Sequence, residues 1–382
     1  MGYVAVKGGG VAIEESLKLH ELERASAQEA ADVKEIEGAL PGLIDQVMGE
    51  ASLYAPRLAA LALKQASGIP DEAVFLLRAF RSTLERPYIS RPVDTGAMRV
   101  DRRISAAFKD VPGGQVLGAT RDYSHRLLEF DLEQEGDAER AEKRRELERH
   151  FADAVAAAAS DGAGAAPAPD TFPRVLDYLR AEGLVAPVAT DDTPPVDATM
   201  VPLPIPAPRS VRLQTLARGM TQAVEALGYA AIRGFGPAHP TVGELRHGTV
   251  EVTVDHPLEQ GGAEDAYYLG AIPVTEVESV FFSEGDENAD GTLSFQVGYG
   301  LVMGASETKA IAMSVLDRCL SSGDKRYPTQ DEEFVLYHVD GVEATGFISH
   351  LKLPHYVTFQ SKLASVRSTR DGGEGAGDAP AV

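Results

Sequence analysis

A long stretch that cannot form a compact core divides this sequence, and it limits the fold more than any other feature. Residues 131–166 are dense in Glu, Arg and Ala and end in a Gly/Ala/Pro run, which is typical of a solvated helix followed by a flexible linker. A brief apolar patch follows at 172–188, and residues 193–208 then carry proline at 194 and 195 and at every second position from 202 to 208. Proline holds the backbone extended and lacks an N–H donor, so this part predicts an irregular crossing. We therefore expect a connector over 131–209 between two core-bearing regions.

The two regions that flank the connector carry different patterns. In residues 1–130, apolar side chains recur at helix spacing through 33–86, and Pro87 ends that run. In residues 210–367, helical patterns alternate with β-branched runs. The 382 residues therefore predict an α+β fold, with a helix-rich N-terminal region and a mixed α/β C-terminal region joined by the Pro/Ala-rich connector, and a disordered tail over 368–382. In the second region, helices are predicted at Val211–Leu227, Thr308–Leu320 and Tyr356–Val366, and strands at Gly248–Asp255, Ala271–Phe282, Leu293–Val297 and Glu333–Val339.

Charge and cysteine content exclude several classes of protein. Lys and Arg total 36 against 58 Asp and Glu, a net charge of −22, which disfavours binding to nucleic acid or to an anionic membrane. No apolar run is long enough for a signal peptide or a membrane span, so we expect a cytoplasmic protein. The single cysteine, Cys319, lies in an amphipathic helical pattern and is expected to be a buried apolar residue. One thiol cannot hold an internal disulfide or an iron–sulfur cluster.

His350 and His355 are the first candidate site residues, because imidazole binds metals and exchanges protons near pH 7. Residues five apart differ by about 140° on a helix, and on a strand they face opposite sides. Pro354 permits a bend that would let both rings face one point. A zinc site normally needs three or four protein ligands, so His338, an acidic residue of 330–333, a water or a partner chain would have to complete it. On spacing alone, two polar loop histidines are the simpler interpretation.

A second candidate is the Gly-rich turn that includes Lys7, Gly8 and Gly9, between a predicted strand at 3–6 and a helical pattern at 11–19. This layout offers backbone N–H groups to a phosphate, although a tight turn explains it equally well.

Two further candidates are cationic segments. Arg233 and His239 flank a glycine-punctuated loop that suits phosphate or phosphonate oxygens, or is simply a surface loop. Arg102, Arg103 and Lys109 form a basic cluster that could hold a polyphosphate; alternatively, it is a charged helix face or a subunit contact. The sequence contains no G-x-S-x-G and no H-E-x-x-H motif, which leaves Ser hydrolase and zincin mechanisms without support.

Several blocks together resemble the I subunit family of the carbon–phosphorus lyase. They run from end to end, apart from residues 131–200 and the tail, and the last one contains the histidine pair. The blocks are Tyr3-Val-Ala-Val-Lys-Gly-Gly9, Leu58-Ala-Ala-Leu-Ala-Leu-Lys-Gln-Ala-Ser-Gly68, Arg102-Arg-Ile-Ser-Ala106, Lys109-Asp-Val-Pro-Gly-Gly-Gln115, Asp122-Tyr-Ser-His-Arg-Leu-Leu128, Gly298-Tyr-Gly-Leu-Val302, Gln330-Asp-Glu-Glu-Phe-Val-Leu336 and Gly346-Phe-Ile-Ser-His-Leu-Lys-Leu-Pro-His-Tyr356.

The resemblance implies a subunit of a phosphonate-degrading complex. With the G, H and L subunits, this type of subunit displaces the purine of ATP or GTP with an alkylphosphonate such as methylphosphonate, and alone it is associated with purine nucleosidase activity. The resemblance also implies that the radical step belongs to the J subunit, that a K subunit joins the assembly, and that the chain self-associates. The family's paired histidines, at a site shared with the J subunit, correspond to His350 and His355, where Zn²⁺ is possible. Mg²⁺ is expected with the nucleoside triphosphate.

Two other interpretations remain open from the residues. The chain could be a non-catalytic scaffold of the same complex, since its acidic charge and long connector suit a multi-subunit surface. It could also be a stand-alone metallohydrolase built on the two histidines.

Overall fold

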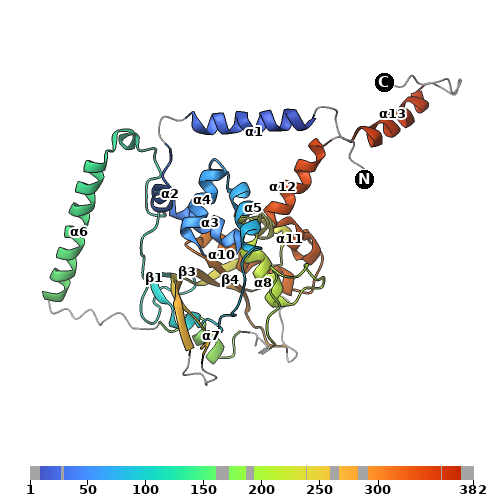
Figure 1. Ribbon diagram of the computed structural model, residues 1–382. Helices are drawn as coiled ribbons and strands as arrows, with labels where there is room; N and C mark the ends of the chain where they lie inside the picture. Colours follow the sequence, from blue (N-terminus) through green and yellow to red (C-terminus); the bar gives the residue numbers. More distant parts are fainter. Residues whose placement is uncertain are drawn as a thin grey trace.

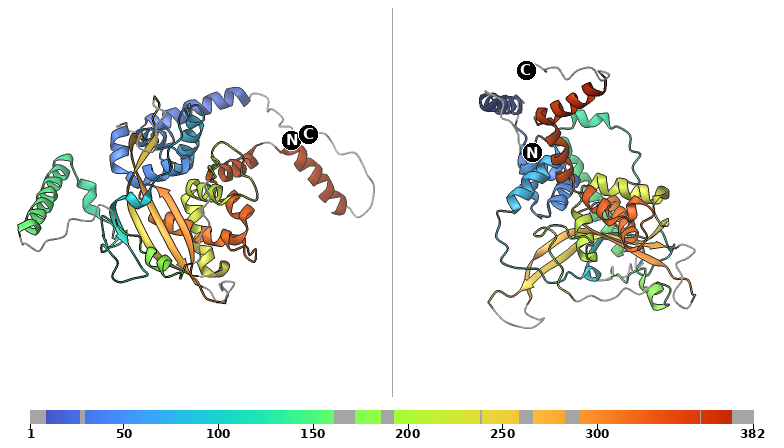
Figure 2. Two further views of the ribbon diagram at one scale, coloured as in Figure 1. Left: turned by 90° about the horizontal axis from the view of Figure 1, so that it is seen from below. Right: turned by 90° about the vertical axis from the view of Figure 1, so that its right-hand side faces the viewer.

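The α+β prediction is confirmed by the computed structural model, which describes residues 9–26, 30–160, 172–185, 193–237, 239–258, 266–282, 291–353 and 355–370. Within these residues, a four-stranded antiparallel sheet of order β1-β2-β3-β4 is covered by helices mainly on one face (Figures 1 and 2). The strands are β1 (Arg99–Ile104), β2 (Pro240–Asp255), β3 (Ala266–Phe281) and β4 (Gln296–Met303). Because β1 comes from the first 130 residues and pairs with β2, the sheet draws on both sides of the connector.

Different kinds of side chain pack on the two faces of the sheet. Val277 of β3 faces α10 (Glu307–Ser321) and belongs to the main apolar core with Met313. Three positions on, Val280 points to the opposite face, as the alternation of a strand requires, and packs with Leu176 next to α7 (Asp177–Ala181). Glu276 and Glu278 share that second face, where they pair with arginines of the 172–185 segment. One face is therefore a hydrophobic core and the other is held largely by buried ion pairs.

Glycines of β4 let α10 lie unusually close to the sheet. A Cβ at Gly300 would lie 2.1 Å from the carbonyl oxygen of Ala310, and one at Gly298 would lie 2.0 Å from that of Ser314. Neither residue has a positive φ, so the reason is space and not backbone conformation. The Gly298–Val302 block therefore serves packing.

A second apolar core lies among the N-terminal helices. They are α2 (Val33–Ala39), α3 (Pro41–Ala51), α4 (Pro56–Gln65) and α5 (Pro70–Arg81), and each of the last three begins with a proline, which costs the first turn no hydrogen bond. Their inward faces contribute the buried residues Ile44, Val47, Leu63, Val74 and Leu77. The helix-spaced pattern over 33–86 is thus confirmed.

Two secondary-structure predictions in the C-terminal region were wrong. Residues Glu332–His338 form helix α11 and not a strand, because the Asp331 side chain accepts the Phe334 N–H as an N-cap and the adjacent Val335 and Leu336 are both buried. The helix predicted at Val211–Leu227 is two helices, α8 (Arg209–Arg218) and α9 (Thr221–Ala230). They separate at Gly219, where a Cβ would lie 2.9 Å from Val339.

Three helices stand away from the body, as Figure 1 shows: α1 (Gly9–Ala25), α6 (Asp137–Ser160) and α13 (Tyr356–Arg370). None of their described side chains is buried. The solvated helix predicted within 131–166 is confirmed as α6. Helix α13 begins at Tyr356 as predicted, but it continues through residues 368–370, which the sequence assigns to the tail.

Some predictions fall outside the described residues, namely the strand at 3–6, the linker after 160 and the tail from 371. The Pro-rich crossing is irregular as expected, although Ala207 is buried and Leu203 packs against the main core. Cys319 is buried, as predicted. None of the helices in the described part of the chain has the length and hydrophobicity to cross a membrane. The boundary at residue 130 stays a prediction.

Candidate functional site

The rings of His350 and His355 lie side by side in the middle of a projecting arm. The arm consists of α12 (Gly341–Ser349), the short turn η5 (His350–Lys352) and α13, and the two rings flank η5. Their centroids are 5.5 Å apart with an interplanar angle of 66°. Pro354, where a bend was predicted, lies outside the residues that the structure describes. The turn η5 nevertheless takes the chain out of the α12 helix before His355. The rings are therefore close enough to act on one ion or one substrate group.

Backbone contacts set the tautomer of both rings. Nδ1 of His350 donates to the carbonyl oxygen of Phe347, and Nδ1 of His355 donates to that of Leu353 at 2.5 Å. With the proton on Nδ1, Nε2 carries the lone pair in each neutral ring. Metal-binding histidines are commonly oriented in this way, with the second nitrogen held by a backbone carbonyl. The pair therefore fits two ligands of a zinc ion or a proton-transfer pair.

The described residues provide no complete metal site. Among them, no group of three His, Cys, Asp or Glu side chains is placed to hold an ion. His338, proposed as a third ligand, bonds the carbonyl oxygen of Phe334 at 2.6 Å and stacks on that ring. In the acidic segment, Asp331 caps α11, and Glu332 accepts the Ala207 N–H at 2.6 Å. Further ligands would have to come from another chain or from water.

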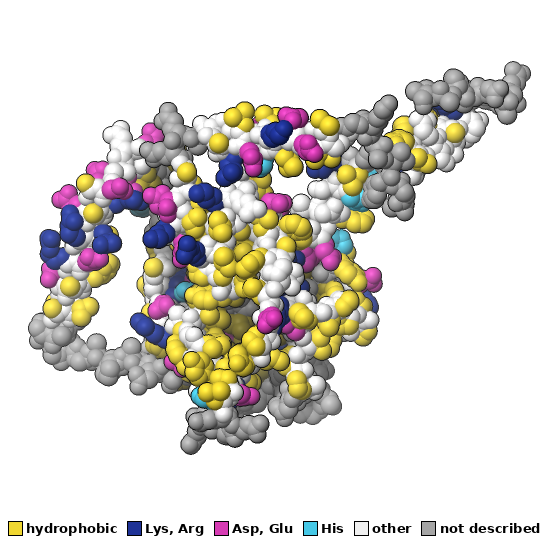
Figure 3. All heavy atoms as spheres, in the orientation of Figure 1, with side chains coloured by type: hydrophobic (Ala, Val, Ile, Leu, Met, Phe, Trp, Pro, Cys, Tyr) yellow, Lys and Arg dark blue, Asp and Glu magenta, His cyan; other side chains and the backbone are white. Residues whose placement is uncertain are grey.

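Exposed apolar side chains surround the histidines. Phe347 is 71% exposed, and its ring lies edge-on to His350 with centroids 5.0 Å apart. Figure 3 shows hydrophobic and histidine side chains where the arm leaves the body. Other large apolar residues of the arm are also exposed: Ile348, Leu351, Leu353, Val357 and Phe359. A surface of this kind marks a protein interface.

An ion pair anchors the arm to the body. Asp340 caps the start of α12 by accepting the N–H groups of Val342 and Glu343, and its carboxylate receives Nη1 of Arg78 at 2.8 Å to both oxygens. Arg78 also donates to the backbone of Glu50 and Arg218. Burial by itself raises the pKa of Asp340, but Arg78 and the Glu343 N–H outweigh it and hold the pKa below its usual value. The carboxylate therefore stays ionised and fixes the origin of the arm.

The basic cluster is largely internal. Arg102 and Arg103 lie on β1 and not on a helix, and they are 3% and 0% exposed. Arg103 pairs with Glu244 at 2.6 Å and donates to carbonyl oxygens of Pro112, Gly114 and Pro173, and Arg102 pairs with Glu307 and Asp122. These partners leave Arg103 no surface to offer a polyphosphate. Lys109 is exposed, in the loop that Arg103 holds.

The other predicted substrate-binding residues do not gather at the histidines. Arg233 lies in η3 (Ala231–Phe235), exposed, with its guanidinium 5.9 Å from the centroid of the Tyr229 ring. His239 is exposed and contacts the carbonyl oxygen of Pro240. Gly9 is the first residue of α1, while Lys7 and Gly8 lie outside the described residues. No contact joins Gly9, Arg233 or His239 to His350 or His355 among the described contacts.

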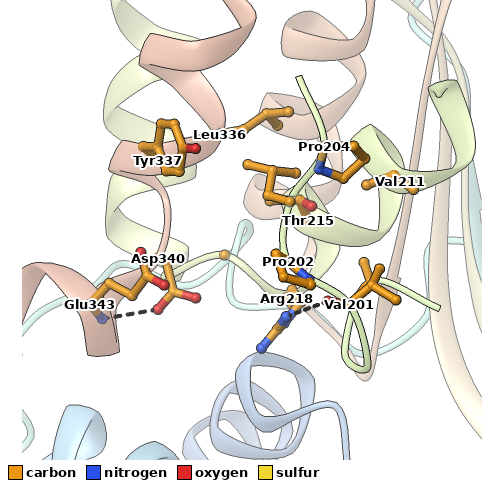
Figure 4. A pocket seen from close by; sticks show the side chains of 13 residues that line it. Val201, Pro202, Pro204, Val211, Thr215, Arg218, Leu336, Tyr337, Asp340 and Glu343 are labelled. Carbon is orange, nitrogen blue, oxygen red and sulfur yellow. Dashed lines mark hydrogen bonds between the residues drawn. The ribbon is translucent and has the colours of Figure 1, made fainter. Parts of the chain in front are cut away.

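A cavity lies at the foot of α12, as Figure 4 shows, and no motif in the sequence predicted it. It has a volume of about 270 Å³, and its walls come from the Pro-rich crossing, α8, α11 and α12. The polar groups on it include Thr215, Arg218, Tyr337, Asp340 and Glu343. These segments are far apart in the chain, and only the fold brings them together.

Comparisons with known proteins point in one direction. A family profile described as "Bacterial phosphonate metabolism protein (PhnI)" matches residues 2–373. A protein from Stutzerimonas stutzeri, named putative C-P lyase subunit protein HtxH, is 45% identical over 97% of this chain and 96% of its own length. Two proteins from Escherichia coli and Rhizobium meliloti, both named alpha-D-ribose 1-methylphosphonate 5-triphosphate synthase subunit PhnI, are 43% identical over 94% and 96% of this chain and 96% and 95% of their own lengths. The similarity includes the segment that carries the two histidines.

Proposed function

Because the chain belongs to the bacterial phosphonate metabolism family PhnI, we propose that it is a subunit of a synthase complex in the carbon–phosphorus lyase pathway. In this reaction, an alkylphosphonate such as methylphosphonate displaces adenine or guanine from ATP or GTP. The product is a ribose 1-alkylphosphonate 5-triphosphate. The reaction class is transfer to ribose C1′, and the chain alone would act as a purine nucleosidase, with water in place of the phosphonate.

The chemistry requires a proton donor and a charge-stabilising group. The C1′–N9 bond breaks, its electron pair leaves with the purine, and an oxygen of the phosphonate forms the new bond to C1′. Protonation of the base, for example at N7, makes it a better leaving group, and a histidine near pH 7 suits that task. The phosphonate anion itself offsets the positive charge that develops at C1′. Mg²⁺ bound to the triphosphate would neutralise part of its charge.

The observation that carries the proposal is the convergence of His350 and His355 on an arm lined with exposed apolar residues. We place the active site there, completed by a partner subunit that covers the arm and supplies the missing groups. The G, H and L subunits are the partners proposed for base displacement, the J subunit for the shared histidine site, and the K subunit for the wider assembly. If Zn²⁺ binds, the Nε2 atoms of the pair would hold it and a partner ligand would complete the set, where it would act as a Lewis acid.

Release of free purine tests the proposal. The chain is mixed with ATP, with and without the G, H and L subunits and methylphosphonate, and free adenine is measured. We expect release that falls at least about a hundredfold in His350→Ala and His355→Ala, the range for loss of a general acid. His150→Ala, an exposed histidine of α6, serves as the matched control and should leave the rate unchanged. Absence of release in every subunit combination would exclude a catalytic role in this step.

A scaffold role is the second candidate, and the projecting helices favour it. α1 carries the exposed apolar residues Val11, Ile13, Leu17, Leu19 and Leu22, which offer surface to other subunits. In that case, the histidine variants would assemble with partners and release purine as fast as the unaltered chain. The stand-alone metallohydrolase interpretation lacks support, since the described residues hold only half of a metal site.

A further inference from the structure

Arg218, which is half-buried and lines the cavity at the foot of α12, and the buried Arg81, whose charge it influences, form no ion pair among the described residues. Arg81, which is 9% exposed, donates from Nη1 to the carbonyl oxygen of Ala51, and its Nε is buried without a hydrogen bond. Arg218 donates from Nη1 to the carbonyl oxygen of Ala198 at 3.0 Å, and its Nε is also buried and unpaired. Among the described residues, neither guanidinium forms an ion pair. Buried charges are normally paired, so this arrangement requires an explanation.

Neighbouring arginines add to the positive charge around Arg81 and Arg218. Arg78 is paired with Asp340, and Arg86 is paired with Asp197 at 2.6 Å, so both of these nearby carboxylates already bind another arginine. Burial, followed by the charge of Arg218, lowers the pKa of Arg81 to about 10, and burial followed by Arg78 lowers the pKa of Arg218. The resolved shifts of the other described arginines go the opposite way: the pKa values of Arg102, Arg174, Arg180 and Arg209 are raised. Among the described arginines with a resolved shift, only Arg81 and Arg218 therefore show a destabilised charge.

The cavity gives a ligand access to Arg218. Pro202 and Pro204 line one side of it, and Thr215 and Tyr337 bring hydroxyl groups. Pockets for drug-sized ligands have volumes of about 300–1,000 Å³. A cavity of about 270 Å³ therefore admits a small ion or one end of a longer ligand. The two carboxylates on the wall do not oppose an anion strongly, because Asp340 is neutralised by Arg78, and Glu343 is exposed at the edge.

We propose that this cavity is a binding site for a small oxyanion, a phosphoryl or phosphonyl group, held by Arg218 with Arg81 behind it. The planar guanidinium of Arg218 would present its Nη groups to oxygens of the ligand, in charge-assisted hydrogen bonds that suit such groups. The hydroxyl groups of Thr215 and Tyr337 are further donors on the cavity wall. The site lies at the start of α12, and the histidine pair lies beyond its end, about 13 Å away along a nine-residue helix. The assignment to a substrate of the synthase rests on the proposed function, but oxyanion binding does not.

Titration calorimetry on the full chain tests the site, with inorganic phosphate and methylphosphonate as probes. Arg218→Met should weaken binding about tenfold to a hundredfold, the effect of losing a charge-assisted pair of hydrogen bonds. Arg218→Lys keeps the positive charge but not the planar guanidinium. Its affinity for the two probes should therefore lie between that of the unaltered chain and that of Arg218→Met. The matched control is Arg212→Met on the same helix, whose buried Nε is also unpaired but which does not line the cavity. It should bind as the unaltered chain does.

Thermal melting gives a second readout that separates folding from binding. At matched ionic strength, phosphate should raise the melting temperature of the unaltered chain and of Arg212→Met but not that of Arg218→Met. If ATP competes with phosphate, the oxyanion that the cavity binds is a phosphoryl group of the nucleotide. If only methylphosphonate competes, it is the phosphonate. Both results support the site. No binding of either anion, or equal binding by Arg218→Met, would overturn it. Purine release is measured separately, so loss of the proposed function and loss of this site are distinguishable.

Discussion

Replacing Asp340 by Asn removes one charge from the foot of the arm while retaining a side chain that can cap α12. Asn is about as good an N-cap as Asp, so the bonds to the Val342 and Glu343 N–H groups can persist. What is lost is the ion pair with Arg78, in which Nη1 lies 2.8 Å from both carboxylate oxygens. The substitution therefore isolates the charge that holds the arm to the body.

The expected loss of stability follows from the burial of the pair. Breaking a fully buried ion pair costs about 3–5 kcal/mol, and an exposed pair contributes about 0–1 kcal/mol. Arg78 and Asp340 are 13% and 21% exposed, and Arg218 adds repulsion once the carboxylate is neutral. We therefore expect Asp340→Asn to lower the free energy of unfolding by about 1–3 kcal/mol. A double-mutant cycle with Arg78→Met should return a coupling of about 1–2 kcal/mol, because the two side chains are in direct contact.

Urea unfolding followed by circular dichroism measures these values. The control is Asp324→Asn, which changes an exposed carboxylate that also bonds a backbone N–H and an arginine, and which should cost no more than about 0.5 kcal/mol. Because the pKa of Asp340 is lowered, its contribution is present above the unfolded value of about 3.9 and is lost as pH falls below it. The difference between Asp340→Asn and the unaltered chain should thus be constant from pH 5 to 7 and shrink in acid. A coupling near zero, or a loss equal to that of Asp324→Asn, would refute the anchoring role.

Arg103→Met should cost about 3–5 kcal/mol and reduce the yield of folded protein, because it leaves Glu244 as a buried charge without its partner; unchanged urea midpoints would contradict this. Gly300→Ala should cost about 1–3 kcal/mol, because its methyl group would lie 2.1 Å from a carbonyl oxygen of α10. The control Gly346→Ala, in open space within α12, should be neutral or stabilising in the same unfolding assay. Burial lowers the pKa of Lys309 to about 8 from 10.5, so the unfolded chain binds more protons between these values and stability should rise with pH there, by up to about 3 kcal/mol. Lys309→Met should flatten that rise, and parallel pH profiles for the two proteins would contradict the reasoning.

The local sequence pattern was enough to predict the elements in which apolar spacing and the residues at the ends indicate the same structure. The helices over 33–86 and helix α10 lie where the period of 3.6 residues predicts them. Where composition and end signals disagree, the end signal decided. The run Phe334-Val-Leu-Tyr337 is typical of a strand, but the Asp331 cap and the joint burial of Val335 and Leu336 produce a helix. A capping residue four positions before a buried apolar residue would have predicted α11.

The charged residues show the limit of sequence reasoning more clearly. Arg102 and Arg103 in an acidic chain suggested an anion site, yet both have carboxylate partners from distant segments. Arg81 and Arg218 carried no motif, yet among the described residues neither forms an ion pair, and each has a buried Nε without a hydrogen bond. The availability of an arginine depends on which acidic side chains the fold brings within about 4 Å, and that distance is not encoded locally.

The sequence by itself determined the α+β class, the family, and the histidine pair as candidate chemistry, because spacing, composition and end-to-end block similarity are properties of the chain. Only the tertiary structure decided that the two rings lie 5.5 Å apart, that the arm carrying them begins at the Arg78–Asp340 pair, and that a cavity lined by Arg218 lies at its foot. The physical reason is that hydrophobic patterning is read from neighbours in sequence, whereas ion pairing, desolvation and cavities arise between segments far apart along the chain.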